Sequence, residues 1–244
     1  MLLPLVLAPL ASGAAVGLAY LFCYGGFEGP VDWAMNTASH GDRDRRIVAL
    51  TFDDGPDPDR TPALLDALGE LGVPGTFFVV GSKAEKHPEL CARMAREGHE
   101  LGNHTYSHRY LPLARSASVA DELARTDAAI FHATGVTPTI ARPPWGGRRP
   151  STVRAFNRAA KRTVLWDVNS YDWKDLPPID VAQRVVDRAR PGSIILMHDG
   201  GRDHTGTIEA VKLLVPELRS RGYDLVTVSD ALLQPELRDE RGAL

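Results

Sequence analysis

The stretch Ile47-Val-Ala-Leu-Thr-Phe-Asp-Asp-Gly-Pro56 joins a β-rich apolar run to two acidic residues and a turn. A short run of this composition is typical of a parallel strand covered on both faces, and Asp-Gly-Pro is a turn sequence. The stretch therefore predicts a buried strand over 47–52 whose carboxyl end presents Asp53 and Asp54. Further runs of this kind follow, and several of them also end in polar side chains.

Apolar runs and amphipathic stretches alternate from residue 46 onward. The expected strands cover 47–52, 75–80, 99–102, 139–141, 163–166, 193–197 and 225–228. The expected helices cover 61–71, 84–97, 116–133, 150–161, 179–190 and 205–221. This alternation predicts an α/β fold with about seven parallel strands, either an open doubly wound sheet or a closed or partly closed barrel. Polar residues follow five of the runs, and a barrel would gather all five ends on one face, so the pattern favours a barrel.

The composition is that of an ordinary globular protein. The chain has 244 residues, a formal net charge of −3 and 43% hydrophobic residues. These values exclude a disordered chain and a strongly basic nucleic-acid binder, so we expect no nucleic-acid partner. Cys23 and Cys91 cannot form a disulfide framework, and stability must come from the core. We expect a monomer.

The amino-terminal segment does not fit an ordinary soluble domain. The first charged side chain is Glu28, and residues 2–24 form a run long enough to span a hydrocarbon core of about 30 Å. Three interpretations are open: an uncleaved membrane anchor, a cleaved signal peptide and an apolar helix buried in the core. Pro4 and Pro9 make this segment a poor soluble helix.

Two histidines stand at a spacing that suits metal binding. His104 and His108 are four residues apart, which places two imidazoles on one face of a helical turn. Together with one carboxylate of the Asp53-Asp54 pair, they would make a three-ligand set with open positions, as catalytic zinc sites have. Two alternatives are open: a carboxylate that caps the turn, and two unrelated surface histidines.

Two further polar groups follow predicted strands. His198 comes directly after the run 193–197, and its ordinary pKa lies near working pH. On the same face as a metal site it would be a candidate general acid, although a packed core histidine is the alternative. Arg142 precedes two prolines in a stiff stretch, and beside a carboxylate it would keep that carboxylate ionised.

Together these motifs resemble a known family. The stretches Thr51-Phe-Asp-Asp-Gly-Pro56, His104-Thr-Tyr-Ser-His108, Arg142-Pro-Pro-Trp-Gly146, Asp172-Trp173 and Leu196-Met-His-Asp199 are similar to the five ordered motifs of polysaccharide deacetylases. That domain is the NodB-type domain of the family 4 carbohydrate esterases, and the likeness covers roughly residues 46–232. The resemblance implies a distorted, partly closed (β/α) barrel and a divalent metal, usually Zn²⁺.

The resemblance also implies roles for individual residues. Asp54, His104 and His108 would bind the metal. Asp53 would be the general base, held by Arg142. His198 would be the general acid, oriented by Asp172. Trp145 would offer its backbone N–H to the oxyanion, and Trp173 and Leu196 would line the acetyl pocket. One position departs from the family pattern, since Asn169 stands where many relatives have Asp, and Asp167 is a second candidate for orienting His198.

The function expected from this resemblance is removal of N-acetyl groups from amino-sugar residues of a glycan polymer or oligomer, such as peptidoglycan or chitin. An O-acetyl esterase on xylan-like glycans and a catalytically silent carbohydrate-binding domain are the alternatives. Wall polymers lie outside the membrane, so we expect an extracytoplasmic protein. Residues 1–27 would then be a membrane anchor or signal peptide, 28–45 a linker, 46–234 the catalytic domain and 235–244 a tail.

Overall fold

The computed structural model describes residues 37–201 and 205–233 of the chain. The strands are β1 (Thr37–Ala38), β2 (Ile47–Asp53), β3 (Thr76–Val79), β4 (Glu100–Asn103), β5 (Ile140–Ala141), β6 (Arg162–Val164), β7 (Val168–Asn169), β8 (Ser193–His198) and β9 (Asp224–Leu225). The α-helices are α3 (Thr61–Leu71), α4 (Gly81–Ala84), α5 (Pro88–Arg96), α6 (Ser116–Thr134), α7 (Pro150–Arg158), α8 (Pro178–Arg188), α9 (Thr205–Ser220) and α10 (Val228–Leu232). Two short 3₁₀ turns are η1 (Leu111–Leu113) and η2 (Pro144–Gly146).

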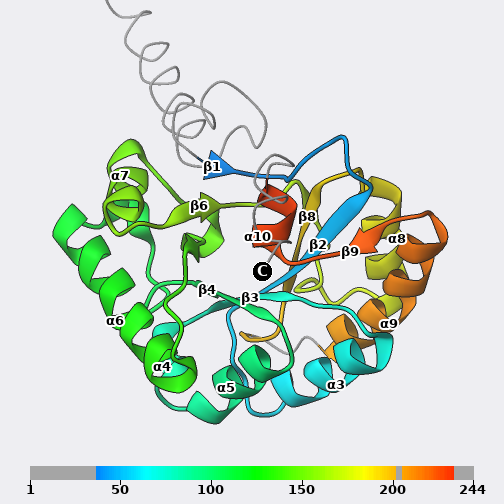
Figure 1. Ribbon diagram of the computed structural model, residues 1–244, viewed down its shortest axis with the longest axis horizontal. Coiled ribbons are helices and arrows are strands. Elements are labelled where there is room, and N and C mark those ends of the chain that lie inside the picture. Colours follow the sequence, from blue (N-terminus) through cyan, green and yellow to red (C-terminus); the bar gives the residue numbers. More distant parts are fainter. Residues whose placement is uncertain (1–36, 202–204, 234–244) are drawn as a thin grey trace, which may run out of the picture.

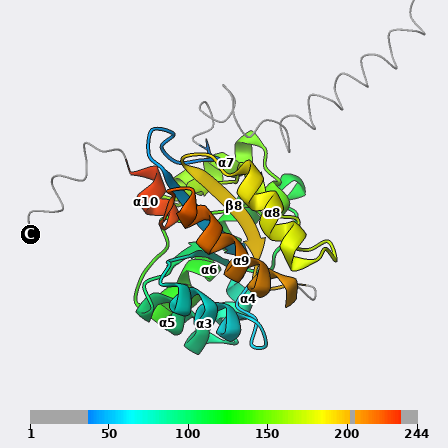
Figure 2. The ribbon, with the colours of Figure 1, turned by 90° about the vertical axis from the view of Figure 1, so that its right-hand side faces the viewer.

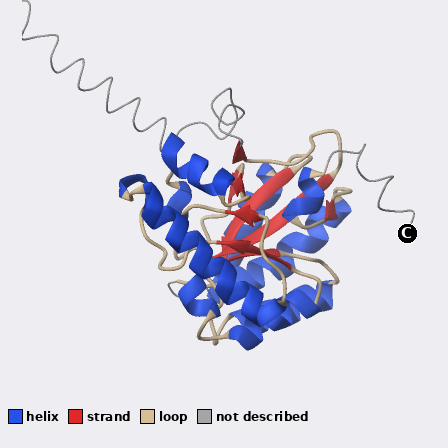
Figure 3. Cartoon of the chain, turned by 60° about the vertical axis from the view of Figure 1, so that its left-hand side comes forward, coloured by secondary structure: helices blue, strands red, loops and turns tan. Residues whose placement is uncertain are grey.

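The strands form one curled parallel sheet, which confirms the predicted barrel-like α/β fold. Their order is β1-β6-β5-β4-β3-β2-β8-β7, and β9 pairs with the start of β2. The larger helices lie around the outside of the strands (Figure 1), and the strands occupy the middle of the molecule (Figure 3). Because neighbouring strands run parallel, their carboxyl ends lie along one edge of the sheet.

Strand β2 lies in the interior of the sheet. All seven of its residues are buried, as the uninterrupted run predicts. Its neighbours are β3 and β8, so both edges of the strand are hydrogen-bonded. On the outer face of the sheet, α8 and α9 pack against each other, and both lie beside β8 (Figure 2). Phe52 of β2 stacks on Phe77 of β3 with ring centroids 5.1 Å apart in the largest core cluster.

The structure differs from the expected elements in a few places. The expected helix over 84–97 is shorter in the structure, because α5 begins only at Pro88 and ends at Arg96, and the preceding short helix α4 ends at Ala84. The expected strand over 225–228 ends at Leu225, and the Thr227 side chain accepts a hydrogen bond from the Asp230 amide at the start of α10.

Two short strands were not expected at all. Within the expected linker, Thr37 and Ala38 form β1 and pair with β6, so this part belongs to the sheet. The second is β7, which pairs with β8. The predicted N-terminal apolar helix lies outside the described residues. Among residues 37–201 and 205–233, no helix combines the length and apolar character needed to cross a membrane.

We predict that Phe52→Ala lowers the free energy of unfolding by about 3–5 kcal/mol, since it leaves a cavity beside Phe77 in the core. The matched control is Phe131→Ala, whose side chain is 54% exposed, with an expected change within about 0.5 kcal/mol. Urea unfolding followed by circular dichroism measures both. Equal effects of the two substitutions would contradict the central position of Phe52.

Candidate active site

A pocket of about 540 Å³ lies at the carboxyl ends of the strands. It gathers most of the residues that the sequence singled out. These are Asp53, Asp54, His104, His108, Trp145, Trp173, Leu196 and His198. Arg142 and Asp172 do not line the pocket but contact residues that do. The pocket therefore joins residues from distant parts of the chain, as expected if the strand ends meet on one face.

Asp54, His104 and His108 form one compact cluster. Their candidate ligand atoms all lie within 4.8 Å of one another. Oδ1 of Asp54 is 2.9 Å from Nε2 of His108 and 3.4 Å from Nε2 of His104. That oxygen is buried, and no donor of suitable hydrogen-bond geometry meets it. One carboxylate and two imidazole nitrogens around a shared point are a donor set that fits a divalent cation such as Zn²⁺.

Contacts with the surrounding backbone and with α6 orient the imidazoles of His104 and His108. Nδ1 of His104 lies 2.8 Å from the carbonyl oxygen of Arg142, and a proton on Nδ1 leaves Nε2 free to face Asp54. The loop between the histidines is tied to α6, because the amides of Tyr106 and Ser107 both donate to the Glu122 carboxylate. The two imidazoles therefore project from a loop between β4 and η1 that hydrogen bonds to α6 hold in place.

Charges in the cluster favour a positive group at its centre. Burial alone would raise the pKa of Asp54, but the neighbouring imidazoles His104 and His108 outweigh burial and hold it well below its ordinary value. Burial alone would lower the pKa of His104, but the negative charges of Asp53 and Asp54 raise it above its ordinary value. A cation at this position would interact favourably with the same two carboxylates.

Asp53 is held by a buried guanidinium. Nη1 of Arg142 donates to Oδ1 of Asp53 at 2.7 Å and to the Thr51 hydroxyl at 2.8 Å, and Nη2 donates to the Leu165 carbonyl at 2.8 Å. Arg142 has no exposed surface. The other oxygen of Asp53, Oδ2, lies 3.7 Å from Nε2 of His104 and thus on the side of the cluster.

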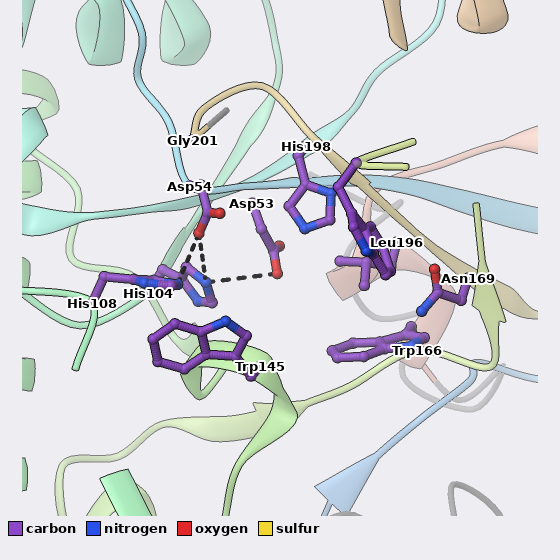
Figure 4. A pocket seen from close by; sticks show the side chains of 11 residues that line it. Asp53, Asp54, His104, His108, Trp145, Trp166, Asn169, Leu196, His198 and Gly201 are labelled. Carbon is purple, nitrogen blue, oxygen red and sulfur yellow. Dashed lines mark ion pairs between the residues drawn. The ribbon is translucent and has the colours of Figure 1, made fainter. Parts of the chain in front are cut away.

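His198 lies across the pocket from the cluster. Strands β2 and β8 are in register with Asp53 opposite His198, so the pairing of the two strands sets the separation of these two residues. Figure 4 shows Asp53 between the cluster and the His198 ring. A carboxylate and an imidazole on neighbouring strand ends can act on opposite sides of one substrate bond.

Asp172 is the carboxylate that contacts His198. Its Oδ1 lies 2.9 Å from Nδ1 of His198, and its Oδ2 accepts the His198 backbone amide at 2.8 Å and the Thr207 hydroxyl at 2.8 Å. Asp167, the second candidate, instead accepts hydrogen bonds from Ser193 and the Ile194 amide. The geometry thus favours Asp172 over Asp167.

The pair Asp172–His198 shifts both pKa values. Burial alone would lower the pKa of His198, but the hydrogen bond and charge of Asp172 outweigh it and raise the pKa to about 9. Burial alone would raise the pKa of Asp172, but His198 and the Thr207 hydroxyl hold it below its ordinary value. His198 is therefore cationic at neutral pH and able to give up a proton.

Aromatic and aliphatic side chains form the rest of the wall. The Trp173 ring meets the His198 ring edge-on at 5.1 Å, and the Trp145 ring meets the His108 ring at 4.4 Å. Trp145 is 57% exposed and has a left-handed backbone with φ of 55°. Leu196 precedes His198 by two residues on β8 and faces the same pocket.

Sequence reasoning gave several residues of the site no role in it. Trp166 and Asn169 line the pocket, and Asn169 Oδ1 accepts the Tyr171 amide at 3.0 Å. Thr207 supports Asp172 from α9. Trp166 stands at the end of an expected strand, which is the signal that could have found it. A lone threonine such as Thr207 carries no signal of this kind.

Comparison with known proteins assigns this chain to a family. The family model described as polysaccharide deacetylase matches residues 40–164. A peptidoglycan-N-acetylglucosamine deacetylase of Bacillus cereus is 36% identical over 190 residues, covering 77% of this chain and 88% of the relative. A chitooligosaccharide deacetylase of a Bradyrhizobium species is 37% identical over 195 residues, covering 74% of this chain and 88% of the relative.

A solved structure agrees with these matches. The crystal structure of a peptidoglycan N-acetylglucosamine deacetylase superimposes with a TM-score of 0.81 at 33% sequence identity, covering 84% of this chain and 97% of that chain. The curled parallel sheet, together with these matches, places the protein among the α/β enzymes that act on carbohydrates. The chain belongs to the polysaccharide deacetylase family, the NodB-type domain of the family 4 carbohydrate esterases, and is a polysaccharide deacetylase.

We predict that Asp172→Asn moves the alkaline limb of the pH–rate profile to lower pH. The raised pKa of His198 keeps it protonated up to about pH 9, and loss of the Asp172 charge lets that pKa fall. The ion pair of Asp172 with His198 also stabilises the folded protein in a pH-dependent way. Its contribution to the free energy of unfolding is complete below about pH 6.5, the pKa of His198 in the unfolded chain, and is lost as the pH rises through about 9.

The matched control is Asp175→Asn, an exposed acidic residue on the same loop. Its profile should overlay that of the unmodified protein. Acetate release measured from pH 6 to pH 10 compares the variants, and an unchanged alkaline limb in Asp172→Asn would show that Asp172 does not set the His198 proton affinity.

Proposed function

We propose that the protein is a metal-dependent hydrolase that removes N-acetyl groups from amino sugars of the N-acetylglucosamine type in peptidoglycan or chitin-like glycans. The observation that carries this proposal is the pocket in which a three-ligand cluster, an Arg-held carboxylate and an Asp-held imidazole face one another. The printed names of the relatives, which include peptidoglycan and chitooligosaccharide deacetylases, support the substrate class.

Asp54, His104 and His108 would hold the cation, for which we propose Zn²⁺. A divalent cation there supplies Lewis-acid polarisation of the acetyl carbonyl and lowers the pKa of a coordinated water toward neutrality. Asp54 contributes the only carboxylate of the set, and the imidazoles add no charge when neutral. The set uses three protein ligands, which leaves positions for water and substrate.

Asp53 is the proposed general base. The hydrogen bond from Arg142 occupies Oδ1 and keeps the carboxylate in place, and Oδ2 is on the side of the cluster where a water molecule would attack. Asp53 accepts the proton of that water as it adds to the acetyl carbon. The backbone N–H of Trp145 is the proposed donor to the oxygen of the tetrahedral intermediate.

His198 is the proposed general acid. A sugar amine is a poor leaving group without a proton, and the Asp172 pair keeps His198 charged and correctly turned to give one. Trp173 packs edge-on against the His198 ring and, with Leu196, would surround the acetyl methyl group. The same residues would exclude bulk water from the reacting bond.

We further propose that the protein acts outside the cytoplasmic membrane. The proposed wall substrates lie there, and residues 2–24 carry no charged side chain. Residues 1–27 would serve as an uncleaved anchor or a cleaved signal peptide, which amino-terminal sequencing of the mature protein distinguishes. The catalytic domain would begin close to residue 37, where β1 joins the sheet.

We predict that Asp53→Asn lowers kcat by about 10²-fold or more and leaves bound zinc unchanged, because it removes the base without removing a ligand. Asparagine keeps an oxygen that can accept from Arg142. In contrast, His104→Ala should lose zinc, whereas His87→Ala on the surface should not. Zinc content by atomic absorption and acetate release together test these roles, and full activity of Asp53→Asn would refute the assignment of the base.

The substrate class is tested by acetate release from peptidoglycan fragments, chitooligosaccharides and acetylxylan. We expect release from the two amino-sugar substrates, abolished by a chelator and restored by added Zn²⁺. Preferential release from acetylxylan would favour the O-acetyl esterase alternative. Saturable glycan binding without any release would favour a silent carbohydrate-binding domain.

A further inference from the structure

Helix α4 lies against the loop that carries the two imidazoles. The amide of Gly81 donates to the Thr105 carbonyl at 2.9 Å, and the amide of Ser82 donates to the Tyr106 carbonyl at 3.0 Å. Both acceptors lie in the loop that follows His104. The first two residues of α4 therefore fix the helix to the backbone that presents the imidazoles.

The same helix also reaches the loop that carries the carboxylate ligand. Nζ of Lys83, in the third position of α4, donates to the backbone carbonyl of Asp54 at 2.6 Å. The Lys83 side chain is partly buried at this contact. One four-residue helix thus contacts both loops from which the proposed metal ligands project, although α4 supplies no ligand itself.

The carbonyl of Asp54 accepts its hydrogen bond from a side chain, whereas the carbonyls on either side of it accept from backbone amides. The Asp53 carbonyl accepts the amide of Asp199 at 3.1 Å, and the Gly55 carbonyl accepts the amide of Val80 at 2.9 Å. Backbone groups hold these two, and no side-chain substitution can remove them directly. Of the three successive carbonyls, that of Asp54 is held by a side chain, so its support can be changed by mutation.

The backbone of Asp54 adopts an uncommon conformation. Its φ is 74°, in the left-handed region, which few residues with a side chain other than Asn and Asp adopt. On its other side the carbonyl is confined by Gly200, where a Cβ would lie only 2.1 Å from the Asp54 oxygen. A small rotation of this peptide would swing the Asp54 carboxylate away from His104 and His108.

We propose that Lys83 is a positioning residue for the cluster of Asp54, His104 and His108. By holding the Asp54 carbonyl from a helix fixed to the imidazole loop, Lys83 sets the carboxylate relative to the two imidazoles and so raises the affinity for a divalent cation. This inference rests on the proposed metal site. It adds a residue that neither touches the substrate nor binds the metal.

A positional role and a purely electrostatic role predict opposite results. Lys83 is positively charged, and removal of a positive charge near a cation site would strengthen cation binding. Loss of the hydrogen bond to Asp54 would weaken cation binding, because the carboxylate ligand would no longer be held at the cluster. The sign of the change therefore separates the two roles.

The test uses the full chain and Zn²⁺ alone. Lys83→Met keeps the length of the side chain and removes the donor, and Lys86→Met is the matched control, since Lys86 is exposed on the same segment. The dissociation constant is measured by competition with a chromophoric chelator, and zinc loss is followed in excess chelator. We expect Lys83→Met to weaken binding by about tenfold or more, the factor typical of a lost charge-assisted hydrogen bond, and Lys86→Met to leave it unchanged.

Further variants separate positioning from general stability. Lys83→Arg retains a cationic donor and should recover most of the affinity. Zinc-free thermal midpoints should show that Lys83→Met and Lys86→Met are both folded at the assay temperature, and Lys83→Gln serves if Lys83→Met does not fold. Unchanged or tighter zinc binding in Lys83→Met, with normal binding by the unmodified chain, would overturn this inference. Absence of zinc binding by the unmodified chain would instead refute the proposed metal site.

Discussion

The buried ion pair between Arg142 and Asp53 is the interaction on which the site and much of the barrel depend. A fully buried guanidinium is costly unless its donors find acceptors. Arg142 finds them on two distant parts of the chain: Asp53 and Thr51 of β2, and the Leu165 carbonyl just after β6. These segments must therefore converge around one side chain. The side chain that holds the proposed base thus also joins the middle of the sheet to the segment after β6.

The two buried carboxylates beside the pocket differ through their partners. Asp53 faces a guanidinium, which stays charged at every pH that the protein meets, whereas Asp172 faces an imidazole that can release a proton. Neighbouring acids that are given different partners can take different roles in one reaction. The arrangement places the proposed proton acceptor, Asp53, at the end of β2 and the proposed proton donor, His198, at the end of β8, its direct neighbour in the sheet.

The sequence predicts the parts of the fold in which a pattern extends over several residues. The run that begins at Ile47 is long enough to identify β2, and the polar residues at strand ends identify Asp53, His104 and His198, because parallel strand ends meet. Strands β1 and β7 have only two residues each, which is too few for a periodic pattern. The choice between Asp167 and Asp172 depended on a turn in which Tyr171 has a φ of 59°. Neither that backbone conformation nor the long-range contact of Lys83 with Asp54 produces a recognisable pattern in the local sequence.

The register of β2 with β8, in which Asp53 stands opposite His198, has a consequence for the order of events during synthesis. The first of these strands is made early and the second late, and non-local strand pairing is a slow step in folding. A growing chain can form the carboxylate and imidazole ends of β2 and β4 long before β8 exists. Such a chain lacks His198, the proposed proton donor opposite Asp53. Under the proposed mechanism, deacetylation would therefore require that nearly all of the curled sheet has been made and paired.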